Sequence, residues 1–328
     1  MGYTHLTMDE RERIARFLAA GLSVTSAAAM VGRSPSTIYR ELARNAAPGH
    51  YSPARAEAAY HSRRQASRRP WRLEGDSDLR ADVLAALLAK WSPEQIAERL
   101  AAEHPRAPQR HVGVATLYRW LARDRATGGQ LYLHLRRQGR RYLKRYGKGR
   151  QCGPIADRRP MDQRSVAADR RSRLGDFEGD TVCAGRAAAL ATLVDRKSRF
   201  LLAAPLADGR ARTMRRAVVA VLGKIPLAKR RTLTLDNGHE FAEHRKIEAA
   251  LGIKAYFAPP YQSWRRGTNE NTNGLLREFF PKRERRKPTR KQVDRAADLL
   301  NNRPRKCLGW RTPAEVFLFK GRFCLQFH

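Results

Sequence analysis

The sequence predicts a chain of several domains, with all-α helix-turn-helix units first and an α/β domain with a mixed five-stranded sheet after them. Two observations lead to this fold class. Short helical patterns separated by Gly- and Pro-containing turns fill the first third of the chain, whereas strand and helix patterns alternate from about residue 173 onward. The length of 328 residues is enough for two or three domains of roughly 100 to 200 residues each.

Three short amphipathic helices are predicted between residues 7 and 44. Apolar residues recur at helical spacing in the second of them, and Gly32 is placed to end it. Ser34 and Pro35 then open the third helix as N-cap and first helical residue. Two helices joined by a Gly-containing turn form a helix-turn-helix unit, whose second helix enters the major groove of DNA. Residues 1–46 are therefore predicted to form a DNA-binding domain.

A second unit of the same kind is predicted over residues 75–126. Ser92 and Gln95 form a capping box, and residues 116–121 repeat the Thr, Tyr, Arg and Leu of residues 37–42 at matching positions. The apolar positions would pack inward and leave polar side chains for DNA, although ordinary bundle helices would show the same pattern. The residues expected to contact DNA are Arg33, Ser36, Thr37, Arg40, Arg44, Thr116, Tyr118 and Arg119.

The charge balance favours a nucleic-acid partner. The chain has 66 Lys and Arg against 31 Asp and Glu, which gives a formal net charge of +35. Nucleic acid is the commonest polyanion that neutralises such an excess, and a ribosomal or membrane-surface protein is the alternative. Basic connectors are expected over residues 47–74 and 127–172, where charge runs serve as solvated linkers and can also follow DNA phosphates.

The cysteines and the hydropathy pattern exclude several classes of protein. Four cysteines lie far apart, without a CxxC pair or a zinc-finger spacing, so we expect reduced thiols and no zinc site. The first residues are polar, and no apolar run approaches the ~18 residues of a membrane span. We expect a cytoplasmic, nucleoid-associated protein that needs neither a membrane nor a small-molecule cofactor.

The α/β domain is assigned to residues 173–328. Strands are expected over 176–183, 188–194 and 200–204, then a helix, a strand over 232–235, a helix over 241–251 and a strand over 254–258. Further helices complete the domain. This order of elements is the one used by ribonuclease-H-like domains.

Three acidic residues stand where such a domain would bring them together. Asp180 lies in the first strand, Asp236 ends the fourth strand, and Glu270 begins the helix after the fifth. Carboxylates are the ligands that Mg²⁺ prefers, and two ions about 3.5–4 Å apart can activate the attacking oxygen and stabilise the leaving oxygen of a phosphodiester. The residues expected to support this site are Asn237, Asn273 and Arg277.

Simpler interpretations of the same acids remain open. Asp236 could start an Asp-Asn-Gly turn, and Glu270 could be a first-turn acid favoured by the helix dipole. Spacing alone also does not separate Asp180 from its neighbours Asp176 and Glu178.

Longer motifs carry a resemblance to a known family. They are Phe-Glu-Gly-Asp-Thr-Val at 177–182, Leu-Asp-Asn-Gly-His-Glu-Phe-Ala at 235–242, Pro-Tyr-Gln-Ser-Trp at 260–264 and Gly-Thr-Asn-Glu-Asn-Thr-Asn-Gly-Leu-Leu-Arg at 267–277. With residues 92–96, 300–306 and 311–317, they resemble the IS-thirty family of insertion-sequence transposases. The resemblance covers nearly the whole chain.

This resemblance implies a retroviral-integrase-type catalytic core with a DDE triad of Asp180, Asp236 and Glu270. It implies two Mg²⁺ or Mn²⁺ ions, cleavage at the ends of the element, and strand transfer into target DNA. The helix-turn-helix units would bind the terminal inverted repeats, and a homodimer or higher assembly would handle both ends. Asp176 and Phe177 depart from a His-Trp pair, and Gln262 and Arg265 depart from a His and a Glu.

Two other functions share these features. A domesticated regulator would bind DNA without cutting it, although its triad would often have lost an acid. A structure-specific nuclease of the same fold would cut DNA without joining it.

Overall fold

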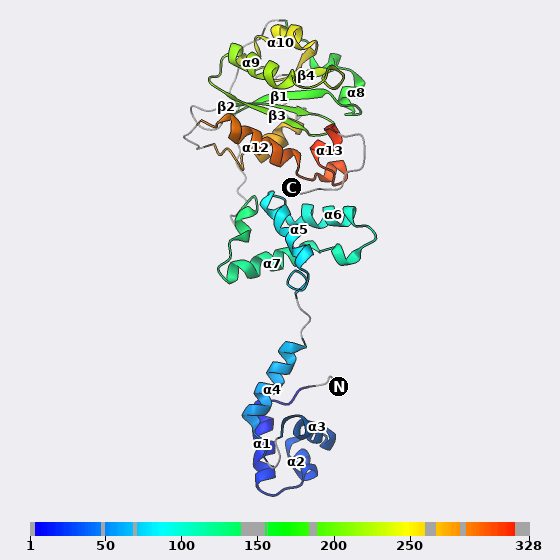
Figure 1. The fold of residues 1–328 in the computed structure, drawn as a ribbon, viewed down its shortest axis with the longest axis vertical. Coiled ribbons are helices and arrows are strands. Elements are labelled where there is room, and N and C mark those ends of the chain that lie inside the picture. The colour runs from blue at the N-terminus through cyan, green and yellow to red at the C-terminus, as the bar shows by residue number, and fades with distance from the viewer. Residues whose placement is uncertain are drawn as a thin grey trace. The chain divides into compact units, whose positions relative to one another are not determined.

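The computed structural model describes residues 4–46, 50–67, 71–138, 155, 157–183, 189–259, 267–282 and 287–318 (Figure 1). The chain divides into two compact units, Met1–Gly75 and Asp76–His328. Gln262 and Arg265, as well as much of the basic stretch of the second predicted linker, lie outside the described residues.

The first unit is a helix-turn-helix domain with one more helix than the sequence predicted. Its helices are α1 (Met8–Ala19), α2 (Val24–Val31), α3 (Pro35–Asn45) and α4 (Pro53–Ala66). Gly32 ends α2, as the sequence predicted, and it does so in the left-handed conformation, at a φ of 77°. The core of the unit is made by the buried residues Leu6, Ile14, Ala28, Val31 and Ile38.

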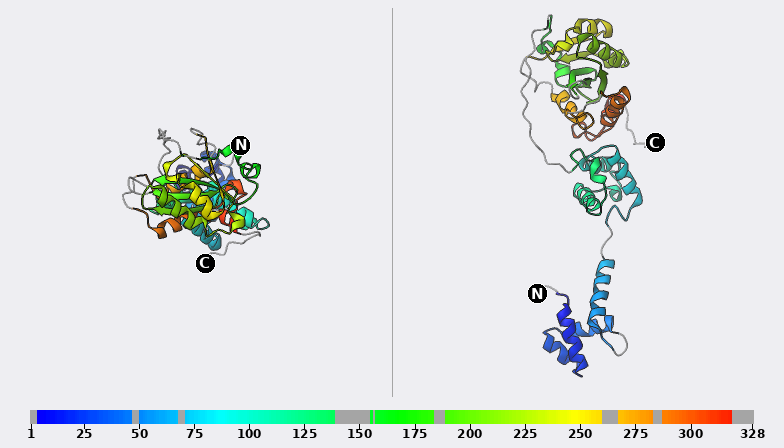
Figure 2. Two further views of the ribbon diagram at one scale, coloured as in Figure 1. Left: turned by 90° about the horizontal axis from the view of Figure 1, so that it is seen from above. Right: turned by 90° about the vertical axis from the view of Figure 1, so that its left-hand side faces the viewer.

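Helix α4 corrects the prediction of a linker over residues 47–74. Ser52 caps the helix and Pro53 begins it, and the buried Ala56 lies on the side that packs against α1. Arg11 of α1 is 2% exposed and forms ion pairs with Glu41 of α3 and Glu57 of α4. The far end of α4 extends past the three-helix bundle, as Figure 2 shows. The packing of α4 was not predicted, because the helix carries a run of charged residues and Ala56 is its one buried residue.

The second unit begins with the other predicted helix-turn-helix. Its helices are α5 (Ser77–Leu88), α6 (Pro93–Glu103) and α7 (Val114–Ala126), with short 3-10 turns η1 (Pro108–Arg110) and η2 (Leu131–His134). Ser92 and Gln95 form the expected capping box.

Helix α6 is attached to the C-terminal part of the α/β domain. Arg99, which is 5% exposed, bonds Glu315 through Nη1 at 3.0 Å and also donates to the carbonyl oxygen of Trp310. Gln95 Nε2 donates to the carbonyl oxygen of Pro304 at 2.9 Å. The second helix-turn-helix therefore packs on the α/β domain through side chains that the sequence did not single out.

The α/β domain is built on a mixed five-stranded sheet, as predicted. The strands are β1 (Asp176–Cys183), β2 (Ala189–Asp195), β3 (Leu201–Leu206), β4 (Thr232–Leu235) and β5 (Lys254–Phe257), in the order β3-β2-β1-β4-β5. Strands β1, β2 and β3 pair antiparallel, whereas β4 is parallel to both β1 and β5.

Helices cover both faces of this sheet (Figure 1). On one face, α9 (Ala211–Leu222) and α10 (His244–Leu251) contribute Met214, Val218 and Ile247 to a core with Phe177. On the other face, α11 (Gly267–Leu276) and α12 (Arg290–Asn301) pack on the sheet, while α13 (Pro313–Leu318) reaches the first core. The short elements are η3 (Met161–Gln163), α8 (Val166–Asp169), η4 (Leu227–Lys229), η5 (His239–Phe241) and η7 (Lys306–Leu308).

One domain boundary differs from the sequence prediction. The α/β domain begins before residue 173, because Ile155 is buried in its core, Pro160 bridges to Phe257 and Arg164 bonds Thr234 at 2.8 Å. Helix α11 ends at Leu276, and beyond it Phe280 is buried whereas Phe279 is only partly buried. In the described part of the chain, no helix combines the length and the apolar character needed to cross a bilayer.

Candidate active site

Asp180 lies in β1, and Asp236 directly follows β4, the parallel neighbour of β1. In the ladder between β1 and β4, Glu178 is the partner of Thr234. Asp180 and Asp236 each lie two residues beyond this pair. Because side chains alternate across a sheet and neighbouring strands lie about 4.8 Å apart, we expect the two carboxylates to share one face and one edge of the sheet. Both are half-buried.

Gly179 allows this close pairing. It faces the opposite side of the sheet from Asp180, where a β-carbon would lie 2.7 Å from Cδ2 of Leu235 and 3.3 Å from side-chain carbons of Leu193 and Leu233. Real β-carbons essentially never approach heavy atoms within 3.0 Å. Because Gly179 has no β-carbon, the three leucines can pack against the face of β1 opposite Asp180.

Helix α11 reaches Asp180 through Asn273. Its Nδ2 donates to Asp180 Oδ2 at 2.9 Å, and its Oδ1 accepts from Thr192 Oγ1 at 3.2 Å. The other carboxylate oxygen of Asp180 accepts the backbone N–H of Thr181 at 2.8 Å. Glu270 stands three residues before Asn273, so both side chains lie on the same side of the helix. Glu270 is exposed.

The Asp-Asn-Gly sequence is a turn as well as part of the site. Asp236 Oδ1 accepts the backbone N–H of Gly238 at 3.1 Å, so the simpler interpretation of this aspartate also holds. Asn237 Nδ2 donates to the carbonyl oxygen of Ala258 at 2.9 Å, and its Oδ1 accepts from Arg158. Asn237 thus holds the ends of β4 and β5 together. Arg158 was not found from the sequence, because its contact with Asn237 joins segments far apart in the chain.

The structure separates Asp180 from the two acids before it. Asp176 is fully buried and bonds Arg173 and Thr232. Glu178 is also fully buried and pairs with Arg196. Asp180 is therefore the one of these three acids that is only half-buried, a distinction that spacing in the sequence did not make.

Glu178 connects the sheet to the helix that carries Glu270. One of its carboxylate oxygens accepts from Arg196, and the other accepts the backbone N–H of Asn269 at 3.0 Å. Arg196 is 4% exposed; burial lowers the pKa of its guanidinium, and the negative charge of Glu178 opposes that shift. Asn269 directly precedes Glu270, so this buried pair fixes where α11 begins.

The donor set at this edge fits a hard cation, but it is not a closed cage. Asp180 and Asp236 supply carboxylate oxygens, which are the ligands that Mg²⁺ prefers. Within the described residues, no three His, Cys, Asp or Glu side chains lie close enough together to hold an ion. Arg277, the remaining predicted support residue, follows α11, and its backbone N–H donates to the carbonyl oxygen of Asn273 at 3.2 Å.

The two helix-turn-helix units repeat each other in structure as well as in sequence. Ile38 of α3 and Leu117 of α7 are buried, whereas Tyr118 is 52% exposed, like the tyrosine at the matching position of α3. Arg40 and Arg119 each donate to the carbonyl oxygen four residues earlier, at 3.0 and 3.3 Å. The sequence match therefore reflects two helices that present the same residue types to solvent.

The remaining predicted DNA contacts differ in their surroundings. Ser36 and Arg44 are exposed on α3, and Thr37 and Thr116 are half-buried at matching positions of their helices. Arg33 instead pairs with Glu10 at 2.8 Å and donates to Thr4 Oγ1 at 2.6 Å. The guanidinium of Arg33 is therefore engaged by Glu10 and Thr4 of its own unit, and Arg33 is not among the DNA contacts proposed below.

Comparison with known proteins assigns the family. The profile of a helix-turn-helix domain matches residues 2–45, and the profile of an integrase core domain matches residues 174–263. The chain is 38% identical over 321 residues to the transposase InsI of insertion sequence element IS30A from Escherichia coli, covering 95% of this chain and 83% of that protein. The chain belongs to the IS30 family of insertion-sequence transposases.

Two further relatives have the same extent. The transposase of insertion sequence element IS4351 from Bacteroides fragilis is 38% identical and matches over 95% of each chain. The transposase of IS1086 from Cupriavidus metallidurans is 36% identical, over 96% of this chain and 94% of its own. The solved catalytic core domain of BIV integrase aligns with 43% of this chain and 92% of its own, at 20% identity and a TM-score of 0.35, and the family assignment does not depend on it.

The transposase thus combines helix-turn-helix DNA binding with an integrase-type (DDE) catalytic domain. Such cores generally use divalent metal ions. The resemblance noted in the sequence and the predicted fold class are both confirmed.

Proposed function

We propose that Asp180, Asp236 and Glu270 of this transposase together hold two divalent metal ions, Mg²⁺ or Mn²⁺. When bound, such ions would supply Lewis acidity to the attacking and leaving oxygens of a phosphodiester. The observation that carries the proposal is the parallel register of β1 and β4, whose pair Glu178–Thr234 lies two residues before Asp180 and Asp236. In support, Asn273 bonds Asp180 and stands one helical turn after Glu270, so that α11 brings the third acid toward the same edge.

The reaction proposed for this site is cleavage at the ends of the element followed by strand transfer into target DNA. The protein residues orient the acids: Asn273 holds Oδ2 of Asp180, the Gly238 amide holds Oδ1 of Asp236, and Glu178 fixes the start of α11. Asp180, Asp236 and Glu270 would come together around a bound DNA end, and this would complete the metal site.

We further propose a division of labour along the chain. Helix α3 of the first unit and helix α7 of the second would contact double-stranded DNA, as inverted repeat or as target. The proposed contacts are Ser36, Thr37, Arg40, Arg44, Thr116, Tyr118 and Arg119. Because two element ends must be processed together, the transposase would act as a homodimer or a higher assembly.

The test is the substitution Asp236→Asn in the full chain, with Asp208→Asn as the matched control. Asp208 is 44% exposed at the side chain and lies in a loop after β3. We expect the Asp236 variant to bind an end duplex as the wild type does and to lose strand transfer by about 10²- to 10³-fold or more, as when a stabiliser of transition-state charge is removed. The control should keep both activities.

Each other outcome has a meaning. Strand transfer that persists in the Asp236 variant would remove this residue from the metal site. A wild-type protein that cuts without joining would be a nuclease, and one that binds without cutting in Mg²⁺ or Mn²⁺ would be a regulator.

A further inference from the structure

A cleft of about 560 Å³ lies in the first unit between α3 and α4. From α3 it is lined by Thr37, Arg40 and Arg44, which stand at helical spacings that place them on one side of that helix. From α4 it is lined by Tyr60, Arg63 and Arg64. Helix α3, which is proposed to contact DNA, therefore faces the basic helix α4 across the cleft.

The cleft is cationic. The side chains of Arg40, Arg44, Arg63 and Arg64 are exposed, and none forms an ion pair with an acidic residue in the described part of the chain. Among the described lining residues, Glu41 is the acid, and it is 9% exposed. Its Oε1 already accepts from Arg11 at 2.8 Å and from the hydroxyl of Tyr51 at 2.9 Å, so it does not neutralise the four arginines.

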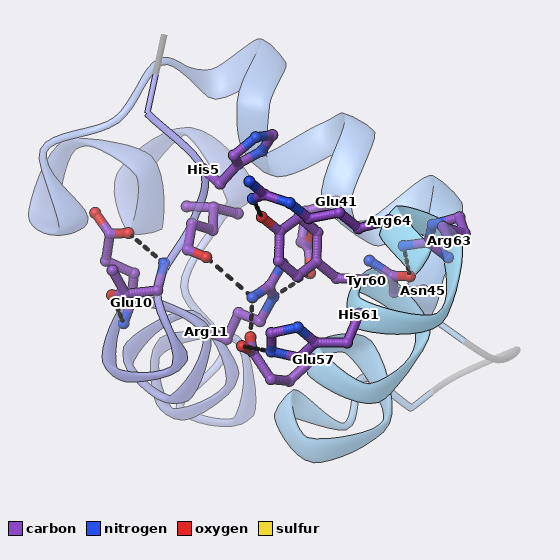
Figure 3. Close-up of polar contacts among 12 residues, drawn as sticks. His5, Glu10, Arg11, Glu41, Asn45, Glu57, Tyr60, His61, Arg63 and Arg64 are labelled. Carbon is purple, nitrogen blue, oxygen red and sulfur yellow. Dashed lines mark hydrogen bonds and ion pairs between the residues drawn. The ribbon is translucent and has the colours of Figure 1, made fainter. Parts of the chain in front are cut away.

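The two arginines of α4 are held in place by neutral partners. Arg63 Nη2 donates to Asn45 Oδ1 at 2.7 Å, and Arg64 Nη1 donates to the hydroxyl of Tyr60 at 2.6 Å (Figure 3). A guanidinium has five N–H donors, so each of these arginines keeps most of its donors for a ligand. The partners orient the two side chains without neutralising their charge.

We propose that this cleft binds a backbone phosphate of DNA, so that Arg63 and Arg64 of α4 clamp one strand while α3 lies in the groove. The inference rests on the proposed function, because it takes α3 as the helix that meets DNA. Phosphate is the ligand that fits four uncompensated arginines, since the guanidinium fork pairs with phosphate oxygens in two parallel hydrogen bonds. Contacts of this kind fix the position of a protein on the duplex without reading its sequence.

The clamp predicts a particular dependence on salt. Each phosphate that a protein neutralises adds about 0.9 to the slope of the logarithm of the binding constant against the logarithm of salt concentration. In the full chain, Arg63→Gln with Arg64→Gln should lower that slope by about 0.9 if both arginines share one phosphate and by about 1.8 if they contact two. Affinity should fall to a similar extent on an element-end duplex and on a random-sequence duplex.

The matched control is Arg16→Gln with Arg55→Gln, which removes two exposed charges from α1 and α4 outside the cleft. A slope that falls equally in both double variants would overturn the clamp, because the effect would then follow net charge alone. If the wild-type chain binds neither duplex, the proposed DNA-binding function itself fails, whereas binding with an unchanged slope in the cleft variant refutes the clamp alone.

A second measurement does not depend on the folding of a double variant. Single phosphates of the element-end duplex are replaced in turn by neutral methylphosphonates, and binding to the wild-type chain is measured. We expect at least one position at which neutralisation weakens the wild type but has no further effect on Arg64→Gln. A scan in which both proteins respond alike at every position would refute the clamp.

Discussion

The buried pair Glu178–Arg196 should be essential both for stability and for the position of α11. The substitution Glu178→Ala would leave the Arg196 guanidinium, 4% exposed, bonded to the carbonyl oxygen of Ala168 but without the carboxylate that neutralises it. It would also leave the backbone N–H of Asn269 without its acceptor. Removal of one partner from a buried ion pair costs about 3–5 kcal/mol.

This cost can be converted into a thermal shift. For a unit of this size, 1 kcal/mol changes Tm by about 2–4 °C, so Glu178→Ala should lower the melting temperature by about 6–20 °C. The assay is thermal unfolding of the full chain, with Glu98→Ala, an exposed acid on α6, as the control that should change Tm little. At a temperature where the variant is still folded, strand transfer should fall as well, because Asn269 adjoins Glu270.

A double variant separates pairing from simple loss of volume. Glu178→Gln leaves an acceptor for Asn269 but an uncompensated Arg196, and the further change Arg196→Met removes that charge. Since well-packed apolar residues often replace a buried ion pair at little cost, the double variant should be more stable than Glu178→Gln alone. The assigned pairing is refuted if Glu178→Ala has the same melting temperature as the wild type. It is also refuted if Arg196→Met destabilises the Glu178→Gln variant as much as it destabilises the wild type.

Two more predictions concern the core and the first unit. Gly179→Ala should destabilise the protein by about 1–3 kcal/mol through overpacking against Leu235. Gly209→Ala is the control, because its β-carbon meets open space and should not lower the free energy of unfolding. Urea unfolding measures both variants, and equal stability would contradict the packing. The hydrogen bond from Arg33 lowers the pKa of the Glu10 carboxyl below its ordinary value of 4.5. The pair therefore stabilises the fold above that pH, and this contribution is lost as the pH falls through the lowered pKa of the folded protein. The stability advantage of the wild type over Glu10→Gln should therefore shrink below about pH 4.5, and an advantage independent of pH would refute the pairing.

Some features of the site followed directly from local sequence. The strand patterns placed Asp180 inside a strand and Asp236 at the end of another, and the structure has those strands at 176–183 and 232–235. The capping box at Ser92 and the end of α2 at Gly32 were also predicted, because caps and turns depend on neighbouring residues. The repeat of residues 37–42 at 116–121 correctly indicated two equivalent helices.

Other features depended on residues far apart in the chain. Spacing along the strand did not separate Asp180 from Glu178 and Asp176, because accessibility is decided by partners such as Arg196 and Thr232. The packed helix α4 was mistaken for a linker, since its contact with the rest of the unit runs through Ala56 and through Arg11 on another helix.

By itself, the sequence determined the fold class, the basic character and the family, and its contiguous motifs indicated the three acids that we propose for the site, because each is encoded in composition or in a contiguous motif. Only the tertiary structure decided which acids are buried, which helix covers the acidic edge, and where α6 attaches to the α/β domain through Arg99. The physical reason is that burial and ion pairing are set by side chains that approach through space. No local pattern records the partner that a charged residue meets after folding.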